Sequence, residues 1–270
     1  VDVYLYPNLY ALVTQTTRVE VALVNLSAQS VVDLDPSKPG LNFVPTGAQP
    51  VDIASTSGGT AAFVGSAQTN HEGIWILPSK TLLSGNTLHL SSFAACALPS
   101  APGPMVVVVA PGAADPAHLD CAGNPSLATE HKNGDLSLET SPTGARKLLV
   151  ALPDQGAIAV LDAQRMLDRD PGSFEACPFE AIIPLRVDLP PTLPHQKVPE
   201  GGWPAGQQAD GSVCELNPAP NVSTNSGYVP RPISIAYDSD SKLVYVGDES
   251  APVVHVLDVS SPCSIQERAP

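Results

Sequence analysis

Short hydrophobic runs occur in pairs along this chain, and each pair is divided by a short polar turn. In three of the four pairs an Asn or Asp ends the second run: Asn25, Asp162 and Asp258. Such runs predict two antiparallel strands joined by a tight turn. Because a two-strand unit cannot bury its own faces, four copies predict a repeat architecture. The pairs are residues 10–14 with 18–25, 62–66 with 73–78, 148–152 with 157–162, and 243–247 with 253–258.

Each pair extends into a unit of four strands. A short opening run precedes the pair at residues 51–54, 136–139 and 233–236, and Gly, Asp or Ser marks the turn that follows it. A further run comes after the pair, as at residues 30–34 and 182–189. Four antiparallel strands joined by tight turns form one blade of a β-propeller. We therefore predict an all-β protein, and the 29 Pro and 20 Gly residues agree with many turns and short strands.

The best-formed unit reads Thr46-Gly-Ala-Gln-Pro-Val-Asp-Ile-Ala and continues to Leu77, and residues 232–258 follow a similar pattern. This pattern resembles the YVTN-type repeat, a family that includes lactonase-like and surface-layer propellers. Rings of this type rarely close with four or five blades, so the resemblance implies part of a six- or seven-bladed ring. Repeats of this kind indicate the fold much better than the function.

The repeats are unevenly spaced. Blades of this kind recur about every 40–50 residues, but the shared strand recurs at intervals of 50, 87 and 95 residues, at Leu12, Ala62, Leu149 and Val244. The long intervals predict loop insertions near residues 96–134 and 190–227. Alternatively, a degenerate blade lies in the first long interval, with one strand near residues 105–110.

We expect residues 1–270 to form one propeller domain or a fragment of one. The remaining blades would then come from a second segment of the same polypeptide, and we expect the chain to be a processed or trimmed piece of a longer protein. The expected blades lie near residues 1–45, 46–95, 135–189 and 228–270.

The charge balance excludes some partners. The chain has 13 Lys and Arg against 27 Asp and Glu, a net charge of −14. A chain of this sign repels phosphate backbones and anionic membrane surfaces, so we expect no nucleic-acid partner. No apolar run approaches 18 residues, so we expect no transmembrane segment in this sequence. The expected contact is a protein partner, and the remaining segment of the same polypeptide is one candidate for it.

The five cysteines do not form a C-x-x-C pair, which argues against a zinc knuckle or a redox dithiol. Cys96 and Cys121 bracket one Pro-rich irregular segment, and Cys177 and Cys214 bracket another. We predict these two disulfides, each stabilising by roughly 3 kcal/mol, and hence an oxidising compartment. The alternative is that all five are buried free thiols. For Cys263 we expect a partner outside this sequence.

Candidate catalytic groups are few. The sequence has no G-x-S-x-G elbow, no G-x-G-x-x-G loop and no Walker A loop. The resemblance implies that a lactonase-like site would lie in the central channel, at the rims of the innermost strands. Asp52, Glu139 and Arg231 are the candidates there, although the same side chains are equally compatible with ordinary channel hydration.

A metal site is a weaker candidate. His118, His131 and Asp115 lie in the first insertion and could bind a divalent cation, but no ordered ligand spacing supports this over a solvated polar loop. We therefore expect no cofactor. Asp33, Asp162 and Asp258 recur after strands, where capping of a turn is the expected role. His255 alternates within a strand and is expected to be a packed or an edge side chain.

The function expected from these features is that of a non-enzymatic β-propeller that binds or assembles proteins. The predicted disulfides and acidic surface favour a bacterial cell-envelope or secreted protein, located in the periplasm, at the outer-membrane surface as a lipoprotein, or outside the cell. The alternative is a lactonase-like hydrolase with its site in the channel.

Overall fold

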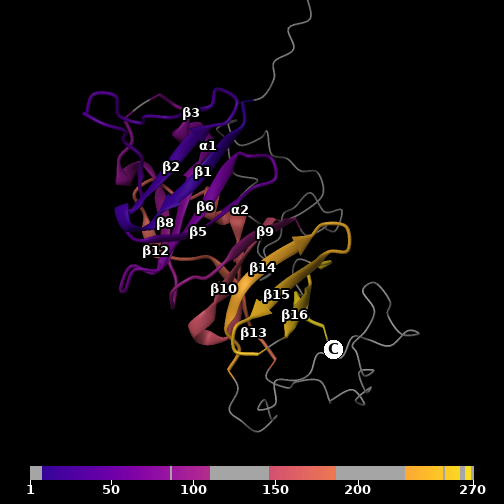
Figure 1. The fold of residues 1–270 in the computed structure, drawn as a ribbon. Coiled ribbons are helices and arrows are strands. Elements are labelled where there is room, and N and C mark those ends of the chain that lie inside the picture. Colours follow the sequence, from indigo (N-terminus) through magenta and orange to yellow (C-terminus); the bar gives the residue numbers. More distant parts are fainter. Residues whose placement is uncertain are drawn as a thin grey trace, which may run out of the picture.

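The computed structural model describes residues 8–85, 87–109, 146–186, 229–251, 253–261 and 265–268, and Figure 1 shows their arrangement. Nearly all of the regular structure is β, in four sheets that follow one another along the chain. Helical segments are short turns between strands. Within the described ranges, no helix is long and apolar enough to cross a membrane.

The first sheet consists of β1 (Tyr10–Gln15), β2 (Glu20–Asn25), β3 (Ser30–Val31) and β4 (Val44–Pro45). β1 and β2 are antiparallel, and the short 3-10 turn η1 (Thr16–Arg18) joins them. The outer edge of β2 pairs with β3 at one end and with β4 at the other. The outer edge of this sheet is therefore shared by two short strands.

The second sheet consists of β5 (Pro50–Ser55), β6 (Ala61–Ser66), β7 (Gly73–Pro78) and β8 (Ala94–Ala97). These four strands are antiparallel and lie in chain order. The connection between β7 and β8 contains α1 (Ser79–Leu82) and the 3-10 turn η2 (Leu90–Ser92). Because β8 reaches Ala97, the second unit extends past residue 95, and Cys96 lies in a strand rather than in an insertion.

The third sheet consists of β9 (Met105–Val109), β10 (Arg146–Leu152), β11 (Ala157–Asp162) and β13 (Phe179–Pro184). The 3-10 turn η5 (Pro153–Gln155) joins β10 to β11. β9 pairs with β10 from Arg146 opposite Val109 to Val150 opposite Met105. The sequence pattern predicts residues 136–139 in this position. That prediction is wrong, because β9 is the strand that pairs with β10 at this edge. Residues 110–145 therefore lie in the chain between two paired strands of one sheet.

The fourth sheet consists of β14 (Pro232–Asp238), β15 (Leu243–Asp248), β16 (Val254–Asp258) and β17 (Gln266–Glu267), all antiparallel and in chain order. Its opening strand includes the predicted run 233–236. The four predicted hairpins are confirmed as β1–β2, β6–β7, β10–β11 and β15–β16.

One strand leaves its own unit. After β11 the chain forms α2 (Ala163–Leu167) and then β12 (Phe174–Ala176), before it returns to the third sheet as β13. β12 pairs in parallel with β8, so it extends the outer edge of the second sheet. We call residues 169–177 the strap, because they cross from the third sheet to the second.

Three apolar clusters fill the spaces between neighbouring sheets. Val21 and Leu23 of the first sheet pack with Val64 and Leu77 of the second. The opposite face of the second sheet, including Phe63 and Ile74, packs on Leu148 and Val150 of the third. The remaining face of the third sheet, including Leu149 and Val160, packs on Val244 and Val246 of the fourth. Alternate residues of each strand point to opposite faces, so both faces of the two middle sheets are covered.

The sheets therefore stack face to face in chain order, with β5 beside β9 and β9 beside β14. This is the packing of successive blades in a propeller-like fold. The predicted all-β class and four-stranded antiparallel units are confirmed. The number of blades and the closure of the ring stay predictions.

Candidate functional site

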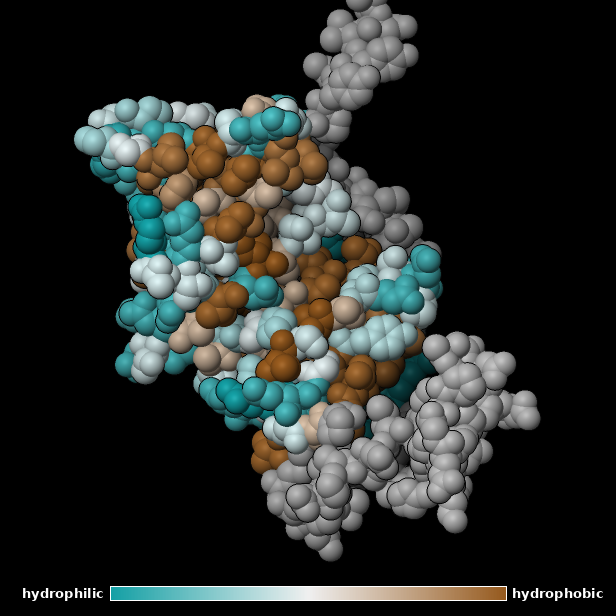
Figure 2. All heavy atoms as spheres, viewed as in Figure 1, coloured by the Kyte–Doolittle hydropathy of each residue, from teal (hydrophilic) through white to brown (hydrophobic). Residues whose placement is uncertain are grey.

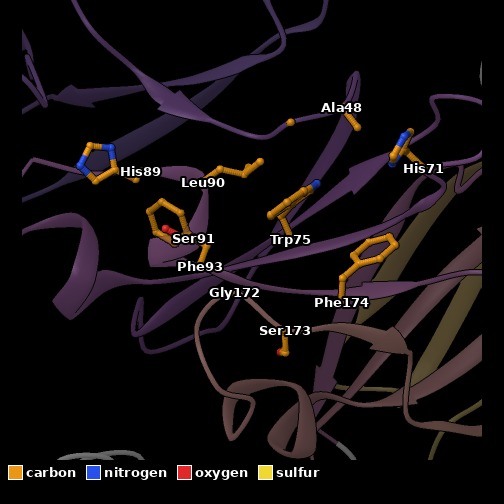
Figure 3. A pocket seen from close by; sticks show the side chains of 11 residues that line it. Ala48, His71, Trp75, His89, Leu90, Ser91, Phe93, Gly172, Ser173 and Phe174 are labelled. Atoms are coloured by element: carbon orange, nitrogen blue, oxygen red, sulfur yellow. The ribbon is translucent and has the colours of Figure 1, made fainter.

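A cleft lies at the outer edge of the second sheet, on the side that faces the first sheet. Its volume is about 570 Å³. Three separate parts of the chain line it: the loop before β5, the strand β7 with the turns on either side of it, and the strap (Figure 3). The lining residues are Gly47, Ala48, His71, Trp75, His89, Leu90, Ser91, Phe93, Gly172, Ser173 and Phe174.

Two aromatic rings dominate the cleft. The ring centroids of Trp75, on β7, and Phe174, on β12, lie 6.5 Å apart with an interplanar angle of 30°. Phe174 is 46% exposed, although a large apolar side chain is usually buried. Figure 3 shows Trp75 in the middle of the cleft, with His71 near one end and His89 near the other. Trp75 is half-buried, because it also packs against the apolar cluster between the first and second sheets. The open parts of the two rings together offer a rigid contact surface.

The loop at Gly47 closes one side of the cleft. Gly47 has a φ of +65°, and a Cβ atom there would lie 2.9 Å from Leu90 Cδ2 and 3.3 Å from Trp75 Cζ2. Glycine is therefore required both for the backbone conformation and for the close approach. The hydroxyl of the buried Thr46 donates to the carbonyl oxygens of Val19, at 3.0 Å, and Ala48, at 2.7 Å. These bonds fix the loop to the first sheet.

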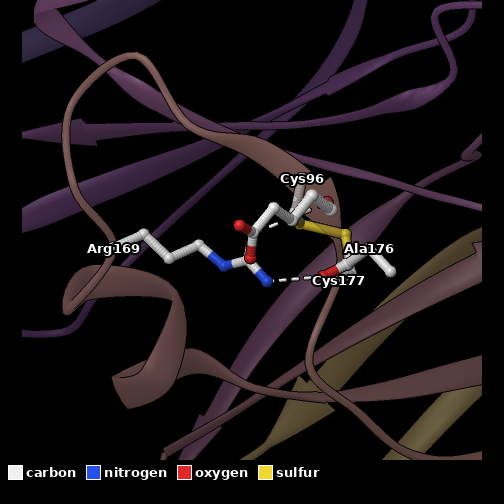
Figure 4. The surroundings of a disulfide bond; sticks show 5 residues. Cys96, Arg169, Ala176 and Cys177 are labelled. Atoms are coloured by element: carbon white, nitrogen blue, oxygen red, sulfur yellow. Dashed lines mark hydrogen bonds between the residues drawn. A yellow bond between two sulfur atoms is a disulfide. The ribbon is translucent and has the colours of Figure 1, made fainter.

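The strap supplies the other side, and a disulfide holds it in place. Cys96 on β8 is bonded to Cys177 at the end of the strap, across 81 residues of sequence. Figure 4 shows Arg169 beside this bond, where its guanidinium donates to the carbonyl oxygen of Ala176 at 2.5 Å. The strap is therefore secured by strand pairing, by an Arg side chain and by a covalent bond.

This disulfide corrects the predicted pairing. The sequence pattern paired Cys96 with Cys121 and Cys177 with Cys214, and both pairs are wrong because Cys96 and Cys177 bond to each other. The prediction assumed that each disulfide closes a single Pro-rich segment. It missed the crossing of the strap from one sheet to another. Cys121, Cys214 and Cys263 lie outside the described residues.

Close packing along β7 allows the strap to approach. A Cβ atom at Gly73 would lie 2.3 Å from the carbonyl oxygen of Cys96 and 3.3 Å from Phe174 Cε2. A side chain at Gly73 would therefore separate β8 from β7 and push Phe174 out of the cleft. Gly47 and Gly73 together let the aromatic rings come close to the sheet.

The lining residues of the cleft are mostly apolar, with two His and two Ser side chains among them. None of the lining residues of this cleft is an Asp, Glu, Cys, Lys or Arg. General acid–base or nucleophilic catalysis needs two or three polar groups within hydrogen-bond reach of one another. His71 and His89 instead lie near opposite ends (Figure 3).

The structure describes two of the three candidate lactonase-like residues, Asp52 and Arg231. Asp52 lies on β5, where its carboxylate accepts a 2.7 Å bond from the backbone N–H of Met105, the first residue of β9. Burial raises the pKa of Asp52, although this bond and one from the N–H of Ile53 oppose the shift. Arg231 lies just before β14 and forms an exposed ion pair with Glu249 at 2.8 Å. Glu139 lies outside the described residues, so a site formed by the three stays a prediction.

The metal candidates His118, His131 and Asp115 also lie outside the described residues. Across the part of the chain that is described, no group of three or more His, Cys, Asp or Glu side chains could hold a metal ion.

The recurring aspartates cap turns, as predicted. Asp33 accepts from the backbone N–H groups of Asp35 and Asn42, both at 3.1 Å. Asp162 caps the start of α2 through the N–H groups of Gln164 and Arg165. Asp258 accepts from the N–H of Ser260 and from the guanidinium of Arg268.

His255 packs inside the fourth sheet, also as predicted. Its Nδ1 lies 2.7 Å from Glu267 Oε1, and its Nε2 lies 3.2 Å from Asp248 Oδ2. The other oxygen of Glu267 accepts from the backbone N–H of Arg186, which comes after β13. This polar cluster therefore links the third sheet to the fourth.

No sequence family and no curated protein matches this chain. Several solved structures are similar to it, and two of them are described here. A functionally unknown protein from Desulfotomaculum acetoxidans DSM 771 has 11% identity and a TM-score of 0.40, over 96% of this chain and 65% of that one. The β-propeller domain of Myceliophteria thermophila Cps50 (Swd1) has 6% identity and a TM-score of 0.34, over 98% of this chain and 72% of that one.

This chain thus spans less than two thirds of the D. acetoxidans protein. Likeness of this degree carries no argument about function, and the propeller-like description depends on the pairing and packing of the sheets themselves.

The cleft is not evident from the sequence. Its one usable signal is the Thr46-Gly47 pair, which opens the best-formed repeat and also fixes the cleft loop. Phe174 carries no such signal, because its partner Trp75 is almost a hundred residues away and belongs to another unit.

Proposed function

We propose that this protein is a non-enzymatic, propeller-like binding module that contacts a protein partner through the cleft at Trp75 and Phe174. The observation that carries the proposal is the pairing of the exposed Phe174 with the half-buried Trp75, in a cleft whose lining residues include no charged carboxylate, amine or thiol. Aromatic anchors in a pocket contribute most of the energy at many protein interfaces. A rigid stack of sheets suits this role, because the residues of the cleft are already held in place before a partner binds.

The disulfide supports a location in an oxidising compartment, since such bonds are rare in reducing cytosol. We propose the periplasm, the outer-membrane surface or the extracellular space. A lactonase-like activity gains no support from Asp52 and Arg231. Asp52 bonds to the backbone of β9 in the neighbouring sheet. Arg231 forms an ion pair with Glu249 at the surface.

A peptide selection tests the binding role. Peptides from a random library are selected on the full chain, and their affinities are measured for the wild type and for Trp75→Ala. Loss of an aromatic anchor costs about 2 kcal/mol or more, so we expect affinities at least about thirty-fold weaker. Phe174→Ala should weaken them by a similar factor.

Phe179→Ala is the matched control. Phe179 is a similarly exposed aromatic residue at the start of β13, outside the cleft. Equal affinity of the selected peptides for the wild type, Trp75→Ala and Phe174→Ala would contradict the proposal. Thermal melts of all variants separate a lost contact from a lost fold.

A further inference from the structure

The cleft at Trp75 and Phe174 offers very few hydrogen-bond acceptors. Apart from the Trp75 indole, the polar side chains that line it are those of His71, His89, Ser91 and Ser173. The two His side chains lie near opposite ends of the cleft (Figure 3), and the hydroxyl oxygen of Ser173 is buried. A peptide in the middle of the cleft therefore finds few side-chain acceptors for its backbone N–H groups. Each N–H group buried without an acceptor weakens binding.

Proline is the residue that suits such a lining best. It has no backbone N–H, so a segment rich in proline enters the cleft without leaving donors unpaired. Proline-rich segments adopt the polyproline II conformation, which docks in grooves lined by aromatic rings. Because this conformation is already extended and ordered before binding, little conformational freedom is lost.

The indole N–H of Trp75 supplies a matching donor. Within the described residues it has no hydrogen-bond acceptor, and the nitrogen is not one of the buried polar atoms that lack a partner. Solvent therefore reaches it. Figure 3 shows the nitrogen on the edge of the ring that faces the loop of Ala48. A polyproline II backbone forms no internal hydrogen bonds, so its carbonyl oxygens are free to accept from this N–H.

Charge distinguishes the cleft from its surroundings. No lining residue is Asp, Glu, Lys or Arg, so an ionised side chain inside the cleft would find no opposite charge there. Glu72 directly follows a lining residue, and Asp170 lies two residues before another. The guanidinium of Arg169 is bonded to the carbonyl oxygen of Ala176.

The chain as a whole is acidic, with a net charge of −14. Figure 2 shows hydrophilic residues, in teal, along the side of the molecule where Figure 1 places β8 and β12. An acidic protein attracts basic ligands. Lys or Arg residues on either side of a proline-rich segment would therefore complement the surroundings of the cleft, whereas the uncharged prolines complement its lining.

We propose that the cleft binds a proline-rich segment of a partner protein in the polyproline II conformation, with Lys or Arg beside the prolines. This inference rests on the proposed function, because it names the ligand class of the same cleft. A sugar suits the lining less well, since the hydroxyl groups of a buried sugar need more polar partners than these side chains provide.

A synthetic peptide tests the inference directly. The probe is a peptide of eight prolines with an Arg at each end, labelled with a fluorophore and titrated with the full chain. The reference peptide has eight alanines between the same two Arg residues. Fluorescence anisotropy should show binding of the proline peptide at least about tenfold more tightly, because its backbone leaves fewer donors unpaired. Equal affinity of the two peptides would overturn the inference.

Trp75→Phe isolates the contribution of the indole donor, since it keeps an aromatic ring and removes the N–H. The affinity of the proline peptide should fall by about five- to tenfold. Phe179→Ala, outside the cleft, is the matched control and should bind like the wild type. Unchanged affinity in a folded Trp75→Phe variant would also overturn the inference. The comparison of the two peptides uses the wild type, so it holds whatever the stability of this variant.

A third peptide, with Glu in place of both Arg residues, tests the charge of the surroundings. It should bind about two- to fivefold more weakly than the Arg peptide at low salt, and the difference should shrink at high salt. Equal or tighter binding of the Glu peptide would overturn the preference for basic residues beside the prolines.

The peptides selected from the random library separate this inference from the proposed function. Enrichment of proline among peptides that lose affinity with Trp75→Ala would support both. Peptides that depend on Trp75 but are not enriched in proline would overturn this inference and leave the proposed function standing. Peptides that bind Trp75→Ala and Phe174→Ala as tightly as the wild type would contradict the proposed function itself.

Discussion

The middle sheets and the end sheets of this molecule are built from similar hairpins but have different surroundings. β6, β10 and β11 are buried along their whole length, because a sheet packs on each side of them. β1 and β15 have one covered face and one open face. The same two-strand unit is therefore continuous core in the middle and a potential interface at the ends. The difference shows that the neighbours of a repeat in the stack decide its stability and its contacts.

The disulfide strengthens the middle of the stack, and removing it should have the largest effect. Cys96→Ser with Cys177→Ser opens a loop of 81 residues in sequence separation. By the chain-entropy relation this costs about 4 to 5 kcal/mol. Denaturant unfolding of the double variant measures the loss.

Binding by the cleft should fall in the same double variant, even in conditions where it stays folded, because the strap then loses its covalent tie. Unchanged stability and unchanged peptide affinity would show that strand pairing alone holds the strap.

The second largest effect is expected at a buried ion pair in the third sheet, one of the two middle sheets. Lys147 on β10 and Glu180 on β13 are both buried, and their charged atoms lie 2.5 Å apart. Lys147→Met leaves a buried carboxylate without this amine, so we expect a loss of about 3 to 5 kcal/mol in free energy of unfolding. Lys147→Met combined with Glu180→Leu should recover most of it, because an apolar pair avoids the desolvation of both charges.

The exposed pair of Arg231 and Glu249 in the fourth sheet is the comparison. Its atoms are at a similar distance, 2.8 Å, but water screens them. Arg231→Gln should change stability by less than about 1 kcal/mol. Equal losses at the two pairs would contradict the distinction between covered and open sheets.

Truncation of a single apolar residue should show a smaller difference in stability between the middle sheets and the end sheets. Leu148 is fully buried between the second and third sheets, and Leu148→Ala should cost about 3 kcal/mol. Val31→Ala, at an open position of the first sheet, should cost less than about 0.5 kcal/mol in a monomer. A loss at Val31→Ala as large as that at Leu148→Ala would contradict the distinction between covered and open positions.

The smallest effect concerns the pH dependence of an end sheet. Bonds from Ser260 and Arg268 lower the pKa of Asp258 from 3.8 to about 2. Because the folded pKa is below the unfolded one, this stabilisation is present above about pH 4 and is lost as the pH falls through about 2. Screening at this surface site keeps it below about 1 kcal/mol.

Carboxyl NMR titration checks this shift. Arg268→Gln should raise the pKa of Asp258 toward 3.8. The pKa of Asp33, which bonds to Asp35 and Asn42 rather than to an Arg, should stay the same. No change at Asp258 would show that Arg268 does not contribute.

Local patterns predicted the hairpins, since apolar runs and a short polar turn determine each β-hairpin within about fifteen residues. The partner of β10 was missed because β9 is separated from it by residues 110–145, and no short-range pattern spans that distance. The opening strands β5 and β14 were found because each is adjacent to its hairpin. Capping by Asp33, Asp162 and Asp258 was also predictable, because it depends on the next few residues.

The cleft and the disulfide were missed for one common reason. Both depend on the strap, which carries Phe174 and Cys177 from the third unit to the edge of the second. A parallel pairing of three residues between two units leaves no periodic signal in the sequence. Trp75 and Phe174 meet only because the fold brings their strands together.

The crossing of the strap is the central claim, since it forms the cleft, joins two sheets and replaces the predicted disulfides. Mass spectrometry of a non-reduced digest tests it most directly. The account predicts a linked pair of peptides that contains Cys96 and Cys177 and that separates on reduction. Linked peptides that join Cys96 to Cys121, or Cys177 to Cys214, would contradict it.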